Sequence, residues 1–228
     1  MVKSSKLGVI DFGKILLETG DLDPLYVILW KSKISKKKLF EWLVAYWCYY
    51  HAGLCCWVID QKDFFKAMKL VASTKGYPRG VERRHFRGQL AIGSIDALEE
   101  QFESAEEIVY WICEGQTSAK GVFRRVQELK GFGPWIAWKV ADMIERLGIA
   151  SLDFVEDDLN FMFSTPKKGA VKTCKIYRLR NQDQLLAAHH YLIEHLGQFK
   201  APPQYERLIS VQETETILCK WKSHLSGH

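Results

Sequence analysis

The chain has 228 residues, and its 32 Lys and Arg against 27 Asp and Glu give a formal net charge of +5 at pH 7. Hydrophobic residues make up 47% of the chain and charged residues 26%, which excludes a disordered or fibrous protein. No apolar stretch approaches the roughly 20 residues of a membrane span, and the first residues do not resemble a secretory signal. These features predict a protein that acts in a cytoplasm and does not enter a membrane.

The chain is rich in aromatic residues, with 8 Trp, 9 Tyr and 12 Phe. In a mildly basic protein these side chains suit the stacking of nucleic-acid bases as well as a hydrophobic core. The six cysteines include no C-x-x-C pair, the usual spacing in a zinc or iron–sulfur site. We therefore expect reduced thiols, no metal site and no cofactor. His189, His190 and His195 are expected on a helix surface, without a role.

Helical periodicity runs through nearly the whole chain, and strand signals are scarce. Ser104 and Glu107 form a capping box, and Pro134 suits the first turn of a helix. Residues 164–181 are basic and irregular, with room for one short strand. The expected helices cover residues 35–51 (ended by Gly53), 54–71, two short pieces of 81–102 that divide near 93–94, a stretch from 105, then 117–129, 136–147, a short helix after Asp153, 181–197 and 205–225.

The predicted fold class is all-α, a single unit over residues 1–228 with two helical lobes around a cleft. The expected lobes are residues 1–80 plus 165–228, and residues 81–164. The short helix after Asp153 is expected to bury one face, formed by Val155, Leu159, Met162 and Phe163.

A pattern with two glycines spans residues 129–141, LKGFGPWIAWKVA. Gly131 and Gly133 allow a tight reversal, and the second helix then opens with unpaired backbone N–H groups that can bind a phosphate. This pattern is typical of a helix-hairpin-helix, which grips nucleic-acid backbones; an ordinary turn between two helices is the alternative. The candidate DNA-binding residues are Lys130, Gly131, Gly133, Trp135 and Lys139.

Residues 129–163 resemble the core of the helix-hairpin-helix DNA glycosylases. In that superfamily an essential aspartate follows the hairpin, caps the next helix and faces a flipped base. The resemblance places this carboxylate at Asp153, which also fits an N-cap with Glu156 three residues later. Glu156 and Asp157 are the other candidates, and a helix cap without catalysis is the alternative. Trp135 stands where strand-cutting members have a lysine, so the resemblance implies no Schiff-base chemistry.

Basic residues cluster in residues 77–88, YPRGVERRHFRG. On a helix beginning near Val81, Arg83 and Arg87 would share a face. Planar guanidinium groups bind phosphate oxygens in pairs, so a converging set suits a multiply charged phosphate. A solvated helix face is the alternative. The candidate ligands of such a group are Arg79, Arg83, Arg84, His85 and Arg87, which we call the arginine block.

The chain also resembles a narrower family, the phage α-glutamyl/putrescinyl thymine pyrophosphorylases, or amino acid:DNA transferases. The resemblance rests on PRGVERRHFRG, on YWCYYHAG upstream and on ETETILCKWKSHLSG near the C-terminus. It implies double-stranded DNA carrying a modified thymine as substrate, and an amino acid or putrescine as nucleophile. The amine would replace the pyrophosphate of 5-pyrophosphoryloxymethyluracil in the cytoplasm of an infected bacterial host. We expect the protein to act as a monomer.

The candidate residues suit this chemistry. The arginine block would neutralise the leaving pyrophosphate, and Asp153 would accept the proton of the amine or hold an ammonium group. The resemblance makes His51 a further catalytic candidate. Trp135, Tyr50 and Trp47 are candidates for stacking a flipped base. Two other functions stay open: a monofunctional DNA glycosylase that excises a modified or damaged base, and a non-enzymatic DNA-binding module.

Overall fold

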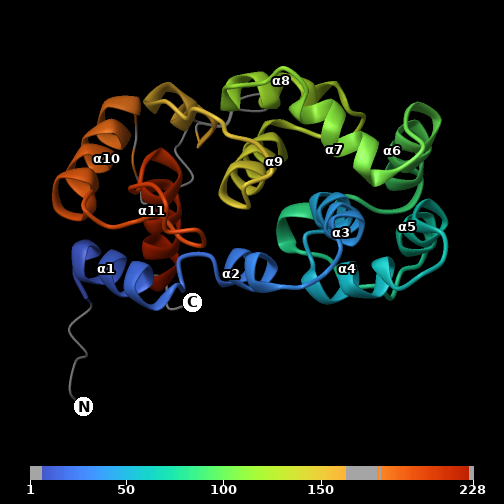
Figure 1. Ribbon diagram of the computed structural model, residues 1–228, viewed down its shortest axis with the longest axis horizontal. Helices are drawn as coiled ribbons and strands as arrows, with labels where there is room; N and C mark the ends of the chain where they lie inside the picture. Colours follow the sequence, from blue (N-terminus) through green and yellow to red (C-terminus); the bar gives the residue numbers. More distant parts are fainter. Residues whose placement is uncertain (1–6, 163–178, 180, 226–228) are drawn as a thin grey trace, which may run out of the picture. The chain divides into compact units, whose positions relative to one another are not determined.

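The computed structural model describes residues 7–162, 179 and 181–225 (Figure 1). Eleven α-helices and two 3₁₀-helices account for most of these residues, and an isolated antiparallel β-bridge joins Lys200 to Leu208. The predicted all-α class is therefore confirmed. The short strand expected within 164–181 falls almost entirely outside the described residues. Over the ranges described, none of the helices is both long and apolar enough to cross a membrane.

Two compact units make up the chain, and unit 1 is formed by two separate parts of the sequence. Unit 1 contains the residues up to 31 and those from 142 onward, and unit 2 contains residues 32–141. These boundaries differ from the expected ones, near residues 80 and 164, because the helices on either side of residue 80 pack on each other. Periodicity along the sequence does not reveal such pairings.

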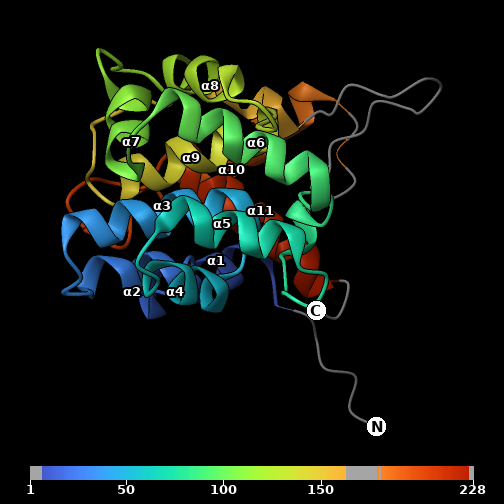
Figure 2. The same ribbon diagram turned by 90° about the vertical axis from the view of Figure 1, so that its right-hand side faces the viewer.

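Helix α3 is the centre of unit 2. Every residue from Phe40 to Tyr49 is buried in it, since α3 packs against both α4 and α7, while α5 packs against α6 (Figure 2). Ser35 caps the helix through its hydroxyl, which accepts a hydrogen bond from the N–H of Lys38. The elements of unit 2 are α3 (Lys36–Tyr49), α4 (Ala52–Ile59), α5 (Phe64–Ser73), η1 (Val81–Arg83), α6 (Gly88–Gln101), α7 (Ala105–Cys113), α8 (Ala119–Glu128) and the first part of α9 (Pro134–Arg146).

Caps explain where unit 2 departs from the predicted helices. The stretch 54–71 is two helices, because the Asp63 carboxylate accepts a hydrogen bond from the N–H of Lys66 and starts a new helix, α5. Gly53 lies inside α4 and does not end α3, which stops at Tyr50 with a left-handed φ of 52°. Helix α6 continues through residues 93–94, where a break was expected. Ser104 caps α7 as predicted.

Unit 1 gathers α1, α10 and α11, which pack together, with η2 against both α10 and α11 (Figure 1). Helix α11 begins at Val211, later than the predicted residue 205, because residues 202–210 adopt turns and extended backbone. The elements of unit 1 are α1 (Val9–Thr19), α2 (Pro24–Lys31), the end of α9, η2 (Glu156–Met162), α10 (Gln182–Leu196) and α11 (Val211–Leu225).

Arg146, at the end of α9, is buried in unit 1 with only 2% of its surface exposed. Its Nε and Nη2 atoms donate to the carbonyl of Pro202 at 3.0 and 2.7 Å, and Nη1 donates to the Asp23 carboxylate. Glu213, which is fully buried, lies 3.5 Å from Nε. Burial opposes the charge on Arg146, but Asp23, Asp142 and Glu213 outweigh it and raise the pKa of the guanidinium.

Arg207 extends this ionic network from the loop before α11. It forms paired hydrogen bonds with Glu145, at 2.7 and 2.8 Å, and with Glu213, at 3.0 and 3.1 Å. Glu213 therefore neutralises two arginines from inside the core. Removing one partner of a buried ion pair leaves the other charge buried without compensation, which costs more than the pair contributes when intact.

We expect Glu213→Ala to lower the free energy of unfolding by about 3–5 kcal/mol, because Arg146 and Arg207 would lose their shared buried partner. Urea denaturation of the full chain measures this change. The matched control is Glu18→Ala on α1, whose carboxylate lies 3.8 Å from Lys14 on an exposed face. The control should cost less than about 1 kcal/mol. Similar losses in the two variants would contradict a central role for the network.

Candidate active site

The two glycines of the 129–141 hairpin have different surroundings in unit 2. Gly131 has a φ of +86°, and a Cβ added there would lie 2.4 Å from Oγ of Ser94 and 3.3 Å from the ring of Phe86. A Cβ added to Gly133 would meet no atom of the described residues within 4 Å. Gly131 is therefore required for packing against α6, whereas Gly133 leaves open space at the turn.

The hairpin presents the start of α9 as predicted, with Pro134 in the first turn. The N–H of Ala137 donates to the carbonyl of Gly133 at 3.0 Å, so the N–H groups of Trp135 and Ile136 precede the first hydrogen bond of the helix. Such groups and the positive end of the helix dipole favour an anion. Lys130 is exposed beside this turn.

The arginine block is not a continuous helix, so the prediction that Arg83 and Arg87 share a helix face is wrong. Residues Val81–Arg83 form one 3₁₀ turn, and Arg87 is extended, with φ −147°, just before α6 begins at Gly88. Glycines on both sides of the turn permit this break. Arg84, His85 and Arg87 are exposed, whereas Arg79 and Arg83 are partly buried.

Arg79 holds the loop that carries the arginine block. Its three nitrogens donate to backbone carbonyls: Nε to Phe86 at 2.8 Å, Nη1 to Tyr77 at 2.9 Å and Nη2 to Val71 at 2.7 Å. The guanidinium also lies over the ring of Tyr49, 5.3 Å from its centroid. Burial lowers the pKa of Arg79. The structure thus gives this arginine internal partners, and its binding of pyrophosphate stays a prediction.

Arg83 connects the arginine block to α3 and to the hairpin. Its Nε donates to the carbonyl of Cys48 at 3.0 Å, and its Nη1 donates to the carbonyl of Gly131 at 3.1 Å. The guanidinium lies 4.4 Å from the ring centroid of Phe86 and 5.3 Å from that of Phe132. Burial lowers its pKa, and its Nη2 is buried with no hydrogen-bond partner among the described residues. A role as a ligand of pyrophosphate stays a prediction for Arg83 as well.

A row of aromatic rings lies between α3 and the start of α9. Trp42 stacks on Tyr46 at 4.8 Å, Tyr46 contacts Tyr50 at 4.6 Å, and Tyr50 meets Trp135 edge-on at 5.0 Å. Tyr50 and Trp135 are half-buried and so keep part of each ring accessible. Trp47 is only 1% exposed, which makes it a core residue.

His51 has a structural partner. Its Nδ1 accepts a hydrogen bond from the N–H of Leu54 at 3.1 Å, which makes His51 the N-cap of α4. Lys139, on α9, is half-buried and interacts electrostatically with Tyr46. Lys139 therefore places a positive charge beside the aromatic row. Local helix capping accounts for the position of His51, and a catalytic role for His51 stays a prediction.

Asp153 is exposed and does not cap the following helix, contrary to prediction. The Asp158 carboxylate instead accepts a hydrogen bond from the N–H of Val155 at 2.9 Å, and the 3₁₀-helix η2 begins only at Glu156. Val155 is 55% exposed, so it is not on the buried face, whereas Leu159 is buried as predicted. The side chains of the other two expected face residues lie outside the description.

Glu156 contacts two histidines of α10 in unit 1. Its Oε1 lies 2.7 Å from Nε2 of His190 and 3.7 Å from Nε2 of His189. His189 is only 5% exposed, which corrects the expectation that it lies on the helix surface. Burial lowers its pKa and favours the neutral imidazole. Asp157 is exposed.

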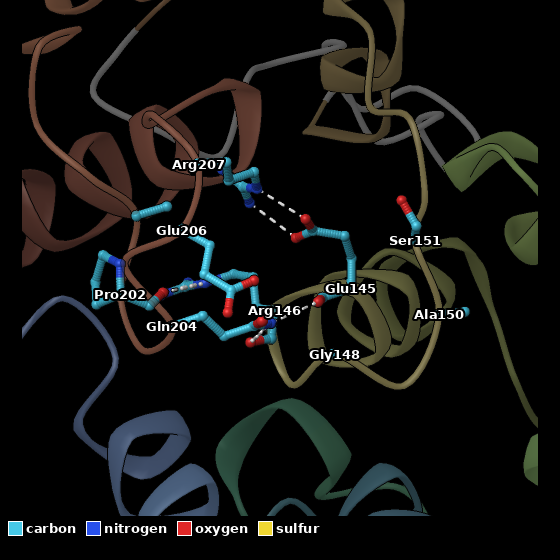
Figure 3. A pocket seen from close by; sticks show the side chains of 10 residues that line it. Glu145, Arg146, Gly148, Ala150, Ser151, Pro202, Gln204, Glu206 and Arg207 are labelled. Atoms are coloured by element: carbon cyan, nitrogen blue, oxygen red, sulfur yellow. Dashed lines mark hydrogen bonds and ion pairs between the residues drawn. The ribbon is translucent and has the colours of Figure 1, made fainter.

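A cavity of about 330 Å³ in unit 1 is lined by residues from two segments, 145–151 and 201–207 (Figure 3). Figure 3 shows Glu145 and Arg207 facing each other, joined by the two hydrogen bonds described above. The arginines of this cavity are committed to structural partners, so it is not a free anion site. No sequence motif connects the two segments, and sequence reasoning missed the cavity.

The sequence comparisons identify relatives over most of the chain. Residues 61–228 match the family model described as amino acid:DNA transferase. The chain belongs to the amino acid:DNA transferase family. It is 37% identical to a glycinyltransferase of Pseudomonas phage PaMx11, over 98% of this chain and 86% of that protein. It is also 23% identical to a putrescinyltransferase of Delftia phage PhiW-14, over 96% of this chain and 73% of that protein.

The region that matches the transferase family contains most of the candidate residues. Residues 61–228 include the arginine block, the hairpin and Asp153. The first part of the aromatic row, on α3, precedes this region, although the glycinyltransferase alignment covers it. The expected transferase activity on DNA is thus confirmed at the level of the family, while the roles of individual residues stay predictions.

We expect Arg83→Ala to lower the free energy of unfolding by about 2–4 kcal/mol, because two charge-assisted hydrogen bonds to backbone carbonyls are lost. Arg87→Ala is the matched control in the same block and should change stability by less than about 0.5 kcal/mol, because Arg87 is exposed. Urea denaturation measures both. Equal effects would show that Arg83 does not hold the block in place.

Proposed function

We propose that the protein joins the amine of an amino acid or polyamine to 5-pyrophosphoryloxymethyluracil in double-stranded DNA and releases pyrophosphate. The observation that carries this proposal is the arrangement of unit 2. There, Arg79 and Arg83 fix a loop against the hairpin and leave Arg84, His85 and Arg87 exposed on that loop. The glycinyltransferase and putrescinyltransferase relatives support an amine as the nucleophile.

The reaction is a substitution at the methylene carbon attached to the pyrimidine ring. The C–O bond to pyrophosphate breaks, pyrophosphate leaves with the bonding electron pair, the amine nitrogen forms the new C–N bond, and the nitrogen loses one proton. Negative charge grows on the bridging oxygen as the bond breaks. Arg84, His85 and Arg87 would stabilise that charge in the transition state.

The proton of the amine requires a base. We assign this role to Asp153, because its carboxylate is exposed and is not used to cap η2. Glu156 contacts His190 and is therefore already engaged, while Asp157 is a second exposed carboxylate. Asp153 could also hold the ammonium group of the nucleophile before the proton is transferred.

The hairpin would bind the DNA backbone. The N–H groups of Trp135 and Ile136 and the open space at Gly133 allow a phosphate to approach the backbone closely, and Lys130 adds a positive charge. The target base must leave the duplex for its methylene carbon to be reached, and the half-buried rings of Tyr50 and Trp135 offer a stacking surface for it. The phage origin of the relatives supports an activity inside an infected bacterium, and we propose that the protein acts in the cytoplasm of this host as a monomer.

The decisive experiment incubates the protein with DNA that contains 5-pyrophosphoryloxymethyluracil and with a pool of amines that includes glycine and putrescine. Transfer predicts release of pyrophosphate and a gain in nucleoside mass equal to the incorporated amine. Abasic sites in the product would indicate a glycosylase. Unchanged DNA that is nevertheless bound by the protein would indicate a DNA-binding module without this activity.

We expect Gly133→Ala to weaken binding to unmodified duplex DNA at physiological salt by about tenfold to a hundredfold. The added methyl group meets no atom in the part of the chain that the structure describes, so the fold should be retained. The methyl would, however, occupy the space through which a phosphate approaches the backbone N–H groups. Losing one charge-assisted hydrogen bond of about 1.5–3 kcal/mol accounts for this range. Fluorescence anisotropy measures the affinity.

The contrast with Gly131→Ala makes the Gly133 result interpretable. At Gly131 the new methyl group would collide with Ser94 and would require a left-handed backbone, so this variant should lose stability. Gly133→Ala should unfold like the unaltered protein. If Gly133→Ala bound DNA as tightly as the unaltered protein, the hairpin would not be the DNA anchor.

We expect Arg87→Ala to slow pyrophosphate displacement by about 10²–10³ under saturating DNA, by analogy with the removal of an oxyanion donor. Affinity for unmodified duplex DNA should stay nearly unchanged, because the proposed contact of Arg87 is with the leaving pyrophosphate and strengthens as negative charge develops there. Arg87→Lys should recover only part of the rate, since an ammonium group lacks the planar pair of donors. Single-turnover release of pyrophosphate measures the chemical step.

A matched control for Arg87 is Arg124→Ala, which removes an exposed arginine from α8 in the same unit. This control should leave the single-turnover rate unchanged. If Arg87→Ala instead weakened DNA binding, lowered its dependence on salt and left the rate normal, Arg87 would contact the DNA backbone and not pyrophosphate.

A further inference from the structure

Three potential metal ligands converge in unit 1. Glu156 comes from η2, and His189 and His190 come from α10. The carboxylate oxygen and the two imidazole nitrogens all lie within 4.8 Å of one another. A tetrahedral Zn²⁺ ion with bonds of about 2.0–2.2 Å separates its ligand atoms by about 3.3–3.6 Å. Small rotations of the exposed Glu156 and His190 side chains would bring the three atoms to that spacing.

A residue of α11 sets the orientation of the His189 ring. Its Nδ1 lies 2.7 Å from the hydroxyl of Thr214, and this hydroxyl donates its single hydrogen to the carbonyl of Val211 at 3.0 Å. The hydroxyl oxygen must therefore accept from Nδ1–H, which leaves the lone pair on Nε2. A hydrogen bond that fixes the tautomer and the ring orientation is the usual support of a metal-binding histidine.

A simple ion pair does not explain the whole cluster. The contact of 2.7 Å between His190 and Glu156 is well described as a hydrogen bond. Nε2 of the buried His189, however, lies 3.7 Å from the same carboxylate oxygen, beyond hydrogen-bond distance, so a direct hydrogen bond does not account for this approach. A cation held between the two atoms would account for it.

We propose that Glu156, His189 and His190 bind a divalent transition-metal ion of the Zn²⁺ class. Two imidazoles and one carboxylate suit Zn²⁺ or Co²⁺, whereas Mg²⁺ and Ca²⁺ prefer ligand sets made of oxygen atoms. Three protein ligands leave at least one coordination position open, as in zinc sites that bind water or a substrate. The site does not depend on the proposed transfer reaction, because the ion would bind in the absence of DNA.

Titration of the full, folded chain with Co²⁺ tests this proposal, since bound Co²⁺ is followed by its visible absorption. The unaltered protein should bind Co²⁺, and Zn²⁺ should displace it. His190→Ala and Glu156→Gln each remove a ligand from an exposed position and should weaken binding at least about tenfold. His195→Ala is the matched control, because it removes an exposed histidine of the same helix whose Nδ1 bonds the carbonyl of Tyr191. It should bind like the unaltered protein.

Thr214→Val tests the support of the site without removing a ligand. Losing the hydroxyl that orients His189 should weaken Co²⁺ binding by about 10–100-fold. Thr216→Val is its control, since this buried threonine lies on the same helix and its hydroxyl contacts Glu215. Circular dichroism confirms that each variant is folded. Absence of Co²⁺ binding by the unaltered protein, or equal affinity in the two ligand variants and His195→Ala, would overturn the proposal.

Discussion

The guanidinium of Arg83 is the contact on which the arrangement of unit 2 depends. It joins the carbonyl of Cys48 at the end of α3 to the carbonyl of Gly131 in the hairpin, and it lies against the rings of Phe86 and Phe132. Three segments that are distant in the sequence are held by one side chain. A charge this enclosed is favourable only because backbone carbonyls and aromatic faces replace the water that it loses.

In this arrangement, the residues of the arginine block fall into two groups with different surroundings. Arg79 and Arg83 donate to the protein's own backbone, whereas Arg84, His85 and Arg87 are exposed, and their contact with an external anion stays a prediction. Gly80 makes the arrangement possible, since a Cβ at this position would lie 2.4 Å from the carbonyl oxygen of Tyr50. The segment that carries a stacking candidate and the segment that carries the arginines are therefore in direct backbone contact.

In unit 1, arginines are likewise stabilised by partners within the protein, and these partners include carboxylates. Arg146 and Arg207 are neutralised by Asp23, Glu145 and Glu213, which come from three separate stretches of the chain. These charges are stable together because Arg146, Arg207 and Glu213 each have several partners within the protein. Unit 1 also carries the exposed Asp153 and the contact of Glu156 with two histidines, which join η2 to α10.

The sequence by itself determined the all-α class, most helix positions, the hairpin and the transferase family, because helical periodicity, glycine spacing and a short arginine-rich motif are local signals. It misplaced the start of η2, since Asp153 fits an N-cap by local spacing, whereas in the folded chain η2 begins only at Glu156 and the carboxylate of Asp158 accepts from the N–H of Val155. Only the tertiary structure decided which arginines are internal supports and that His189 is buried beside Glu156. Hydrogen bonds and burial between residues far apart in the chain leave no periodic trace in the sequence.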